Sequence, residues 1–172
     1  MFLRISAFII CGMFVLALVG CSDDSPSSNS SKDVYNPIGV EGVPDVIITD
    51  TPPAELPGNR ITVTDARLNK DSLVLVVEYS GGCVEHDFAC YMFPAAFMES
   101  LPPQANLYVL DNTDNDPCDD GIVTDYAIFD VSPVASLHWD HYGYVYDIYI
   151  NVIDLSSGVP VEKFRLLYDL IP

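Results

Sequence analysis

The sequence predicts an all-β domain, either a single antiparallel β-sandwich of the immunoglobulin-like kind or a small barrel, with about seven strands. From residue 60 onward apolar side chains recur at every second position, which is the period of a strand rather than of a helix. Turn-forming residues separate these short runs, as is typical of sandwiches and barrels. A helical turn suits residues 95–100 alone, and Pro102 and Pro103 would end it.

The first expected element of the domain is a hairpin at residues 60–79, with its turn at residues 69–71. Its second strand is apolar on both faces, which indicates a strand covered on both sides. Cys90 should be buried, because it falls on the apolar, even-numbered face of an expected strand at residues 84–92. The other strands are expected at residues 107–110, 122–131, 144–152 and 163–170, and residues 46–49 suit a short edge strand.

Residues 1–20 have the features of an export signal. One positive charge, Arg4, precedes an apolar run at residues 5–19 in which Ser6 is the one clearly polar member. This run is shorter than the about 20 apolar residues that a membrane-spanning helix needs.

Residues 18–21, LVGC, resemble the lipobox of bacterial lipoproteins. The resemblance implies cleavage after Gly20, attachment of diacylglycerol to the sulfur of Cys21, and acylation of the new amino group, for example with palmitate. Several buried acyl chains form a durable membrane anchor. By the sorting rule of these lipoproteins, Ser22 favours the outer membrane, at its periplasmic face or at the cell surface. An ordinary secretory signal with a chance cysteine is the alternative.

Residues 21–59 are expected to form the lipidated N-terminus and a flexible tether, and residues 60–172 the β domain. The tether begins with a segment rich in Ser and Asp, and its residues 42–59 are interrupted by four prolines. Such a composition cannot bury enough apolar surface to offset the entropy lost on ordering.

The chain is strongly acidic, with 25 Asp and Glu against seven Lys and Arg and a formal net charge of −18. Loss of residues 1–20 would leave six basic residues against 25 acidic ones, a net charge of −19. This charge argues against binding to nucleic acid, and against electrostatic binding to anionic lipid. It is compatible with a cationic partner or a divalent metal ion, although acidic surfaces commonly serve solubility alone.

Three cysteines remain for the folded domain, Cys83, Cys90 and Cys118, in a compartment that favours disulfides. If residues 84–92 are extended, Cys83 and Cys90 lie about 23 Å apart, whereas a disulfide tolerates a Cα separation of about 7 Å. Cys83 lies at a strand entrance and Cys118 in a long acidic loop, so we expect these two to pair. A Cys90–Cys118 bridge, or no bridge, remains an alternative.

Four stretches resemble small bacterial lipoproteins of unassigned function: YSGGCVEHDF, ESLPPQANL, DPCDD and FDVSP. The shared pattern is GGC-x-x-H-x-F, then E-S-x-P, D-x-C and F-D-[LV]-S-P. It covers residues 79–133, about a third of the chain. Cys83, His86, Phe88 and Cys118 match the pattern and Cys90 does not, which supports the Cys83–Cys118 pairing. The resemblance implies no activity.

Two metal sites compete with the disulfide interpretation. Cys83, His86 and Cys118, with Asp116 or Asp119 as a fourth ligand, have the chemistry for Zn²⁺. The loop at residues 111–121, which includes Asp114 and Asp116, offers the oxygen ligands that Ca²⁺ prefers, although it does not match an EF-hand. A buried core histidine and a solvated acidic loop are the competing interpretations.

Residues 138–146, HWDHYGYVY, are expected to lie between strands. There Trp139, Tyr142 and Tyr144 could stack against a glycan or against a partner's side chain, or cap the core. No G-x-S-x-G, P-loop or H-E-x-x-H motif is present in the sequence. The sequence therefore predicts a lipid-anchored envelope protein with a non-enzymatic module that binds a protein or glycan. A metal-binding envelope module is the alternative.

Overall fold

The computed structural model describes residues 41–170 except 115, 118–120 and 144–146. Within these residues the chain forms nine strands and one helix. In order they are β1 (Ile47–Ile48), β2 (Asn59–Arg60), β3 (Thr62–Asn69), β4 (Ser72–Ser80), β5 (Phe88–Met92), β6 (Gln104–Asp111), β7 (Ile122–Asp130), α1 (Ser132–Tyr142), β8 (Ile148–Asp154) and β9 (Val161–Tyr168).

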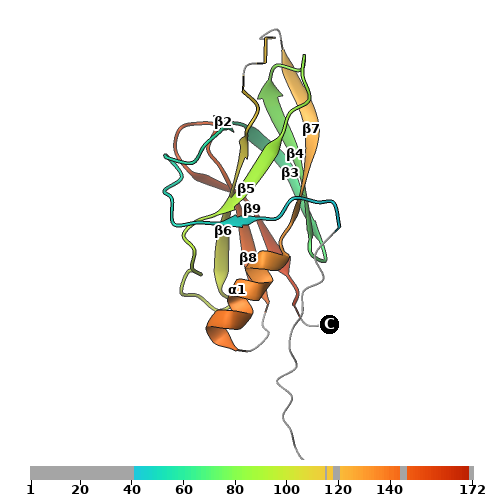
Figure 1. Cartoon of the computed structure of the whole chain (residues 1–172). Coiled ribbons are helices and arrows are strands. Elements are labelled where there is room, and N and C mark those ends of the chain that lie inside the picture. Colours follow the sequence, from blue (N-terminus) through green and yellow to red (C-terminus); the bar gives the residue numbers. More distant parts are fainter. Residues whose placement is uncertain (1–40, 115, 118–120, 144–146, 171–172) are drawn as a thin grey trace, which may run out of the picture. The chain divides into compact units, whose positions relative to one another are not determined.

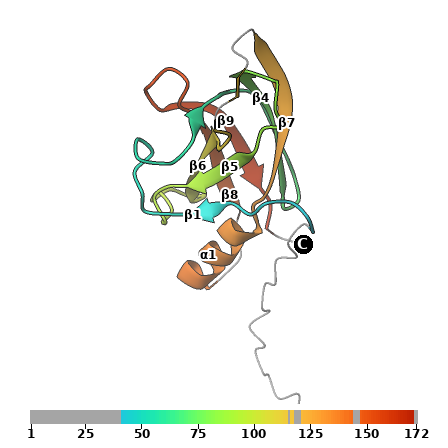
Figure 2. The ribbon, with the colours of Figure 1, turned by 45° about the horizontal axis from the view of Figure 1, so that its top comes forward.

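The strands form two sheets (Figures 1 and 2). One is antiparallel and three-stranded, in the order β3-β4-β7. The other has six strands, in the order β1-β5-β6-β8-β9, with β2 paired to β6. Among the described residues neither sheet closes into a barrel.

The prediction of an all-antiparallel, all-β domain was wrong in two respects. The pairs β1–β5 and β6–β8 are parallel, so the larger sheet is mixed. A parallel pair needs a long crossover, and the segment between β6 and β8 provides it by forming β7 in the other sheet and then α1. The helix is the second difference.

One apolar core lies between the two sheets, and the alternation read from the sequence predicts it well. The expected hairpin forms as β3 and β4, and the inward residues Leu73, Leu75 and Val77 are fully buried. Leu107 and Ile150 face them from the six-stranded sheet, within the same cluster. Cys90 belongs to this core, as expected, with no exposed surface.

A second apolar cluster lies on the outer face of the six-stranded sheet. Leu56, from the segment before β2, packs there with Tyr91, Tyr108 and Leu110. Strands β5 and β6 are therefore the strands covered on both sides. For β4 that expectation was wrong, because its outer residues Val74 and Val76 are only half-buried.

Part of the predicted tether packs into the domain. Val46 is buried in the central core, Leu56 is buried in the outer cluster, and β1 pairs with β5. The short edge strand expected at residues 46–49 is thus present. Residues 1–40, with the predicted signal and Cys21, lie outside the described residues.

Helix α1 occupies part of the segment expected to be a loop. Pro133 lies in the first turn, where its missing N–H costs nothing, and Gly143 ends the helix in a left-handed conformation with φ 67°. The helical turn expected at residues 95–100 is absent, and the chain there has bends and an isolated bridge to Gln104. No helix in the described part of the chain is long and apolar enough to cross a membrane.

Candidate functional site

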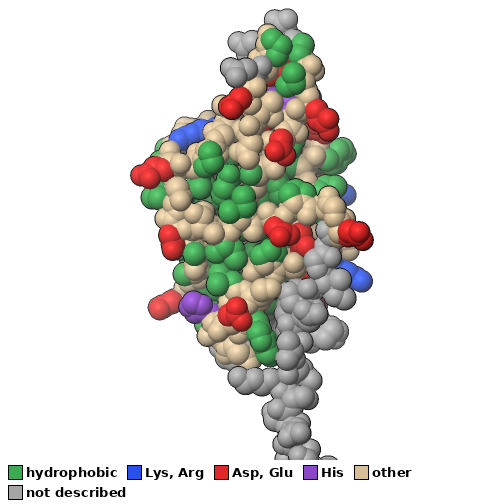
Figure 3. Space-filling model, in the orientation of Figure 1, with side chains coloured by type: hydrophobic (Ala, Val, Ile, Leu, Met, Phe, Trp, Pro, Cys, Tyr) green, Lys and Arg blue, Asp and Glu red, His purple; other side chains and the backbone are tan. Residues whose placement is uncertain are grey.

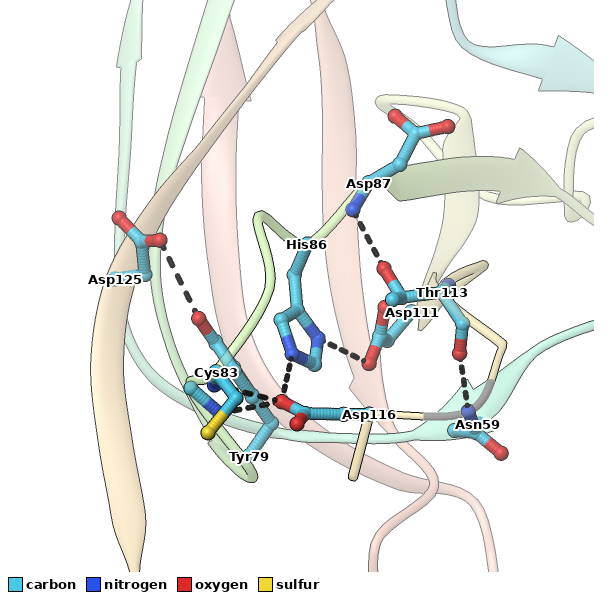
Figure 4. A network of polar contacts seen from close by, with 10 residues as sticks. Asn59, Tyr79, Cys83, His86, Asp87, Asp111, Thr113, Asp116 and Asp125 are labelled. Atoms are coloured by element: carbon cyan, nitrogen blue, oxygen red, sulfur yellow. Dashed lines mark hydrogen bonds and ion pairs between the residues drawn. The ribbon is translucent and has the colours of Figure 1, made fainter. Parts of the chain in front are cut away.

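The segment between β4 and β5 brings the sequence-predicted residues together. Strand β5 begins at Phe88 rather than at residue 84, so residues 81–87 leave the sheet. Gly81 and Gly82 have φ values of 134° and 111°, which side-chain-bearing residues rarely adopt. This irregular segment turns His86 toward the loop that follows β6 (Figure 4).

His86 bridges two aspartates. Its Nδ1 lies 2.8 Å from Oδ2 of Asp111 and its Nε2 lies 2.9 Å from Oδ2 of Asp116. The three side chains are 2%, 5% and 8% exposed, respectively. Because carboxylates accept and do not donate hydrogen bonds, both ring nitrogens must carry a proton. The geometry therefore defines a cationic imidazolium between two anions, which we call the Asp–His–Asp cluster.

Two opposing effects set the pKa of His86. Burial alone would lower it, because the charged form loses hydration. The hydrogen bonds to Asp116 and Asp111 act in the other direction and outweigh burial, so the pKa of His86 lies above its ordinary value of 6.5.

Further hydrogen bonds connect the two aspartates to the surrounding backbone. Oδ2 of Asp116 accepts from the N–H groups of Gly82 and Cys83. Oδ1 of Asp111 accepts from the Thr113 N–H at 2.9 Å. The Thr113 hydroxyl oxygen in turn accepts from the N–H of residue 87 at 2.8 Å. Two loops distant in sequence are therefore joined by one polar network, and such networks rigidify a structure when every member is satisfied.

Aromatic rings form the remaining wall of the cluster. The Tyr79 ring lies 4.1 Å from the His86 ring, centroid to centroid, and 5.6 Å from Phe88. A cation next to an aromatic ring is stabilised by the ring quadrupole. The Tyr79 hydroxyl donates to Asp125 of β7 at 3.5 Å, and burial, together with Asp125, raises the pKa of Tyr79.

The cysteines differ in environment. Cys90 is free and fully buried, and burial raises the pKa of its thiol, so it is an inert core residue. The alternative Cys90–Cys118 bridge is therefore wrong. Cys83 is disulfide-bonded, but Cys118 lies outside the described residues, so the Cys83–Cys118 pairing stays a prediction.

The candidate metal ligands converge in part. His86 and Asp116 are in contact, and the Cys83 backbone lies beside them, whereas Asp114 is exposed. Within the described ranges no group of three or more His, Cys, Asp or Glu side chains could hold a metal ion. Each nitrogen of His86 already faces a carboxylate, so a metal would have to displace one of them. Cys118 and Asp119 lie outside the described residues.

Two of the three candidate aromatic binding residues lie on a helix and not at a loop tip. Trp139 and Tyr142 lie on α1, and Tyr144 is outside the described residues. The Tyr142 ring lies 6.0 Å from Phe97 and 4.9 Å from His138, centroid to centroid. His138 is 1% exposed and burial lowers its pKa. Tyr142 thus belongs to an aromatic group with Phe97, which packs against the core, and His138. A binding role for Trp139, Tyr142 and Tyr144 stays a prediction.

Sequence reasoning missed the role of Asp111. It was counted with the acidic loop, although it is the last residue of β6 and is 3% exposed. The available signal was its position at the end of an apolar strand, where an acidic residue that turns inward needs a cationic partner.

No protein-family model and no curated protein matches the sequence. Among solved structures, a candidate lipoprotein from Bacteroides fragilis is similar, with a TM-score of 0.50, 12% identity, and coverage of 74% of this chain and 70% of that one. A candidate toxin-related protein from Parabacteroides distasonis (TM-score 0.48, 16% identity, 74% and 61% coverage) also matches. So does a NigD-like immunity protein from Bacteroides caccae (0.45, 14%, 74% and 65%).

These similarities bear on the fold alone. Each identity is far below the level at which function transfers, and fold by itself does not imply function. The chain spans about three-fifths of the length of the Parabacteroides protein. The likeness to the Bacteroides fragilis protein therefore shows a shared fold and nothing more.

Proposed function

We propose that this chain is an envelope lipoprotein, anchored in the outer membrane through acylated Cys21, and that its β domain is a non-enzymatic binding module. The observation that carries the proposal is the LVGC motif directly after an export signal. The fold shared with a candidate Bacteroides lipoprotein is consistent with it. The polar segment between Cys21 and the domain gives the domain reach away from the lipid.

We propose a structural role for the Asp–His–Asp cluster. A general base needs a ring nitrogen that can reach a substrate proton. In His86 both nitrogens face carboxylates, and the side chain is almost fully buried. The cluster therefore holds the segment before β5 against the loop after β6, and we propose no reaction for it.

We further propose that the disulfide of Cys83 is made with Cys118. Of the three domain cysteines Cys90 is free, and Cys118 is the one that remains in the domain sequence. The covalent link would close a loop of about 34 residues, which the chain-entropy model credits with about 3–4 kcal/mol. It would restrain the same loop that Asp116 fixes to His86.

The anchor is tested by expressing the full chain in a Gram-negative host and comparing it with Cys21→Ala. A matched control is Cys11→Ala, which removes another cysteine of the signal but keeps LVGC. We expect the parent chain and Cys11→Ala in the outer-membrane fraction, with an N-terminal peptide that begins at acylated Cys21. Cys21→Ala should lose the acyl mass. An unmodified Cys21, or retention of residues 1–20 on the parent chain, would refute the proposal.

The disulfide is tested by alkylating the chain that begins at acylated Cys21, after denaturation, with and without reductant, alongside elemental analysis for zinc and calcium. We expect one alkylated thiol, Cys90, without reductant and three with it. Three thiols alkylated without reductant, together with stoichiometric zinc, would instead establish the metal-binding alternative.

A further inference from the structure

Strand β7 is an edge strand with one side open. Among the described residues it pairs along its length with β4 alone. At its C-terminal end Asp130 uses its N–H and C=O on the other side, donating to the Pro44 carbonyl at 2.8 Å and accepting from the Val46 N–H at 2.9 Å. The outer edge is therefore occupied at one end.

The contacts of Asp130 show which other residues of β7 direct their backbone N–H and C=O groups away from β4. In an antiparallel pair alternate residues direct both their N–H and their C=O away from the partner strand. Since Asp130 does so, Ile128, Tyr126 and Thr124 do so too. The Tyr126 N–H is bound by Oδ1 of Asp125 at 2.7 Å. No described residue pairs with the outward groups of Thr124 and Ile128, which leaves a template for another strand.

The face next to this edge is apolar and uncovered. Tyr126 is 68% and Ile128 42% exposed. They lie opposite Val76 and Val74 of β4, respectively. Val74, Val76 and Tyr126 line a depression of about 150 Å³, together with Asp65 and Arg67 of β3. Contiguous exposed apolar side chains of this kind mark interaction sites.

Strand β9, at one edge of the six-stranded sheet, carries more charged side chains than β7. Strand β9 carries Glu162, Lys163 and Arg165, and charged side chains are a common means of preventing edge-to-edge pairing. Strand β7 carries one charge, Asp125, between its first residue and Phe129. Of β7 and β9, β7 is therefore the strand better suited to accept another strand.

The charge of the chain indicates which kind of segment could pair with β7. The chain has a net charge of −18, and Figure 3 shows acidic side chains spread over one face with few basic ones. Near the open edge lie Asp125 and Glu78, which is opposite Thr124, while Arg67 is paired with Asp65 at 3.0 Å. A second copy would bring like charge to this edge, whereas a basic segment would be attracted to it.

We propose that β7 accepts an extended, basic segment of a partner protein as the fourth strand of the three-stranded sheet. The proposal rests on the proposed function of the domain as a binding module and names its surface and partner chemistry. Main-chain hydrogen bonds to Thr124 and Ile128 provide affinity, and side chains on the outer face provide selectivity. A Lys or Arg of the segment lies over the exposed Tyr126 ring.

The probe is a capped heptapeptide in which Lys alternates with Val, added to the full chain in nonionic detergent. Binding is measured by calorimetry and by amide hydrogen exchange. We expect binding, with slower exchange at Thr124 and Ile128. Two matched peptides should not bind. One has Glu in place of Lys, and the other is N-methylated at every backbone amide. Equal binding of either control peptide, or no slowing at Thr124 and Ile128, would overturn the proposal.

Two variants locate the site. Ile128→Pro removes an outward N–H and no bond to β4, and Pro is tolerated at such edge positions, so it should abolish binding. Tyr126→Ala alters an exposed side chain and should weaken binding by about tenfold. Leu167→Ala, on β9, is the control that should bind unchanged. If the chain instead associates with itself, and Ile128→Pro abolishes this association, the partner of β7 is a second copy and not a basic segment.

Failure of the anchor can be told apart from failure of this surface. The mass of the N-terminal peptide from the same sample reports acylation at Cys21 independently of peptide binding. If Cys21 is not acylated but the peptide binds, the anchor alone is refuted. If Cys21 is acylated but the peptide does not bind, the β7 surface alone is refuted.

Discussion

The two sheets differ in what covers their outer faces. On the six-stranded sheet, Leu56 and its neighbours cover Tyr91, Tyr108 and Leu110, so a second apolar cluster is buried. On the three-stranded sheet, Tyr126 and Ile128 remain exposed. Both faces carry apolar residues on alternate positions of a strand. The difference teaches that alternation shows which faces are apolar, whereas a remote segment of the chain decides which of them is covered.

The largest difference in unfolding free energy should come from truncating one apolar side chain on the outer face of each sheet. Leu110→Ala removes a side chain that is 2% exposed, and leaving a cavity there should cost about 3 kcal/mol of unfolding free energy. Ile128→Ala on the open face should cost under about 1 kcal/mol. Guanidinium unfolding of both variants measures the difference, and equal losses would show that the open face is covered in solution.

His86→Ala should cause the second-largest loss of stability, because it leaves two buried carboxylates without their cation. Breaking a buried ion pair costs about 3–5 kcal/mol, and we expect about 2–3 kcal/mol because Asp116 and Asp111 would keep their hydrogen bonds from backbone N–H groups. His141→Ala, an exposed histidine of α1, is the control and should change stability by less than about 0.5 kcal/mol. A loss no larger than that of the control would show that the cluster does not join the two loops.

The pH dependence of stability should be smaller than the effect of removing His86. Because the pKa of His86 is raised in the folded state, its contribution is complete below its ordinary pKa of 6.5 and declines as pH rises through the folded-state pKa. As pH is raised from 6.5, the denaturant midpoint of the parent should therefore fall relative to the midpoint of His86→Ala measured at the same pH. Parallel curves for the two proteins would contradict a cationic His86.

The smallest stability effect is expected for Tyr126→Thr on the open face. The side chain is mostly exposed and Thr suits a strand, so the unfolding free energy should change by less than about 0.5 kcal/mol. Thermal unfolding of the full chain measures it. A loss above about 2 kcal/mol would mean that the ring is buried by a segment of the same chain.

Local periodicity accounts for what the sequence predicted correctly. The hairpin of β3 and β4, the buried position of Cys90 and the positions of β6, β7 and β9 all follow from alternation of apolar residues. Helix α1 was not predicted, although Pro133 and Gly143 are start and stop signals, because its apolar residues do not form a clear stripe at helical spacing.

The candidate site was less predictable because its partners are remote in sequence. His86 fell on the apolar face of an expected strand, and the carboxylates that hold it lie 25 and 30 residues away. The two parallel pairings depend likewise on where a crossover returns to the sheet. Neither can be read from a local pattern.

Amide hydrogen exchange on the full chain without any partner tests the central contrast most directly. Thr124 and Ile128, whose outward N–H groups have no described partner, should exchange at least about a hundredfold faster than amides within β6, which pairs with strands on both sides. Comparable protection in β6 and along the outer edge of β7 would contradict an open edge and, with it, the proposed binding surface.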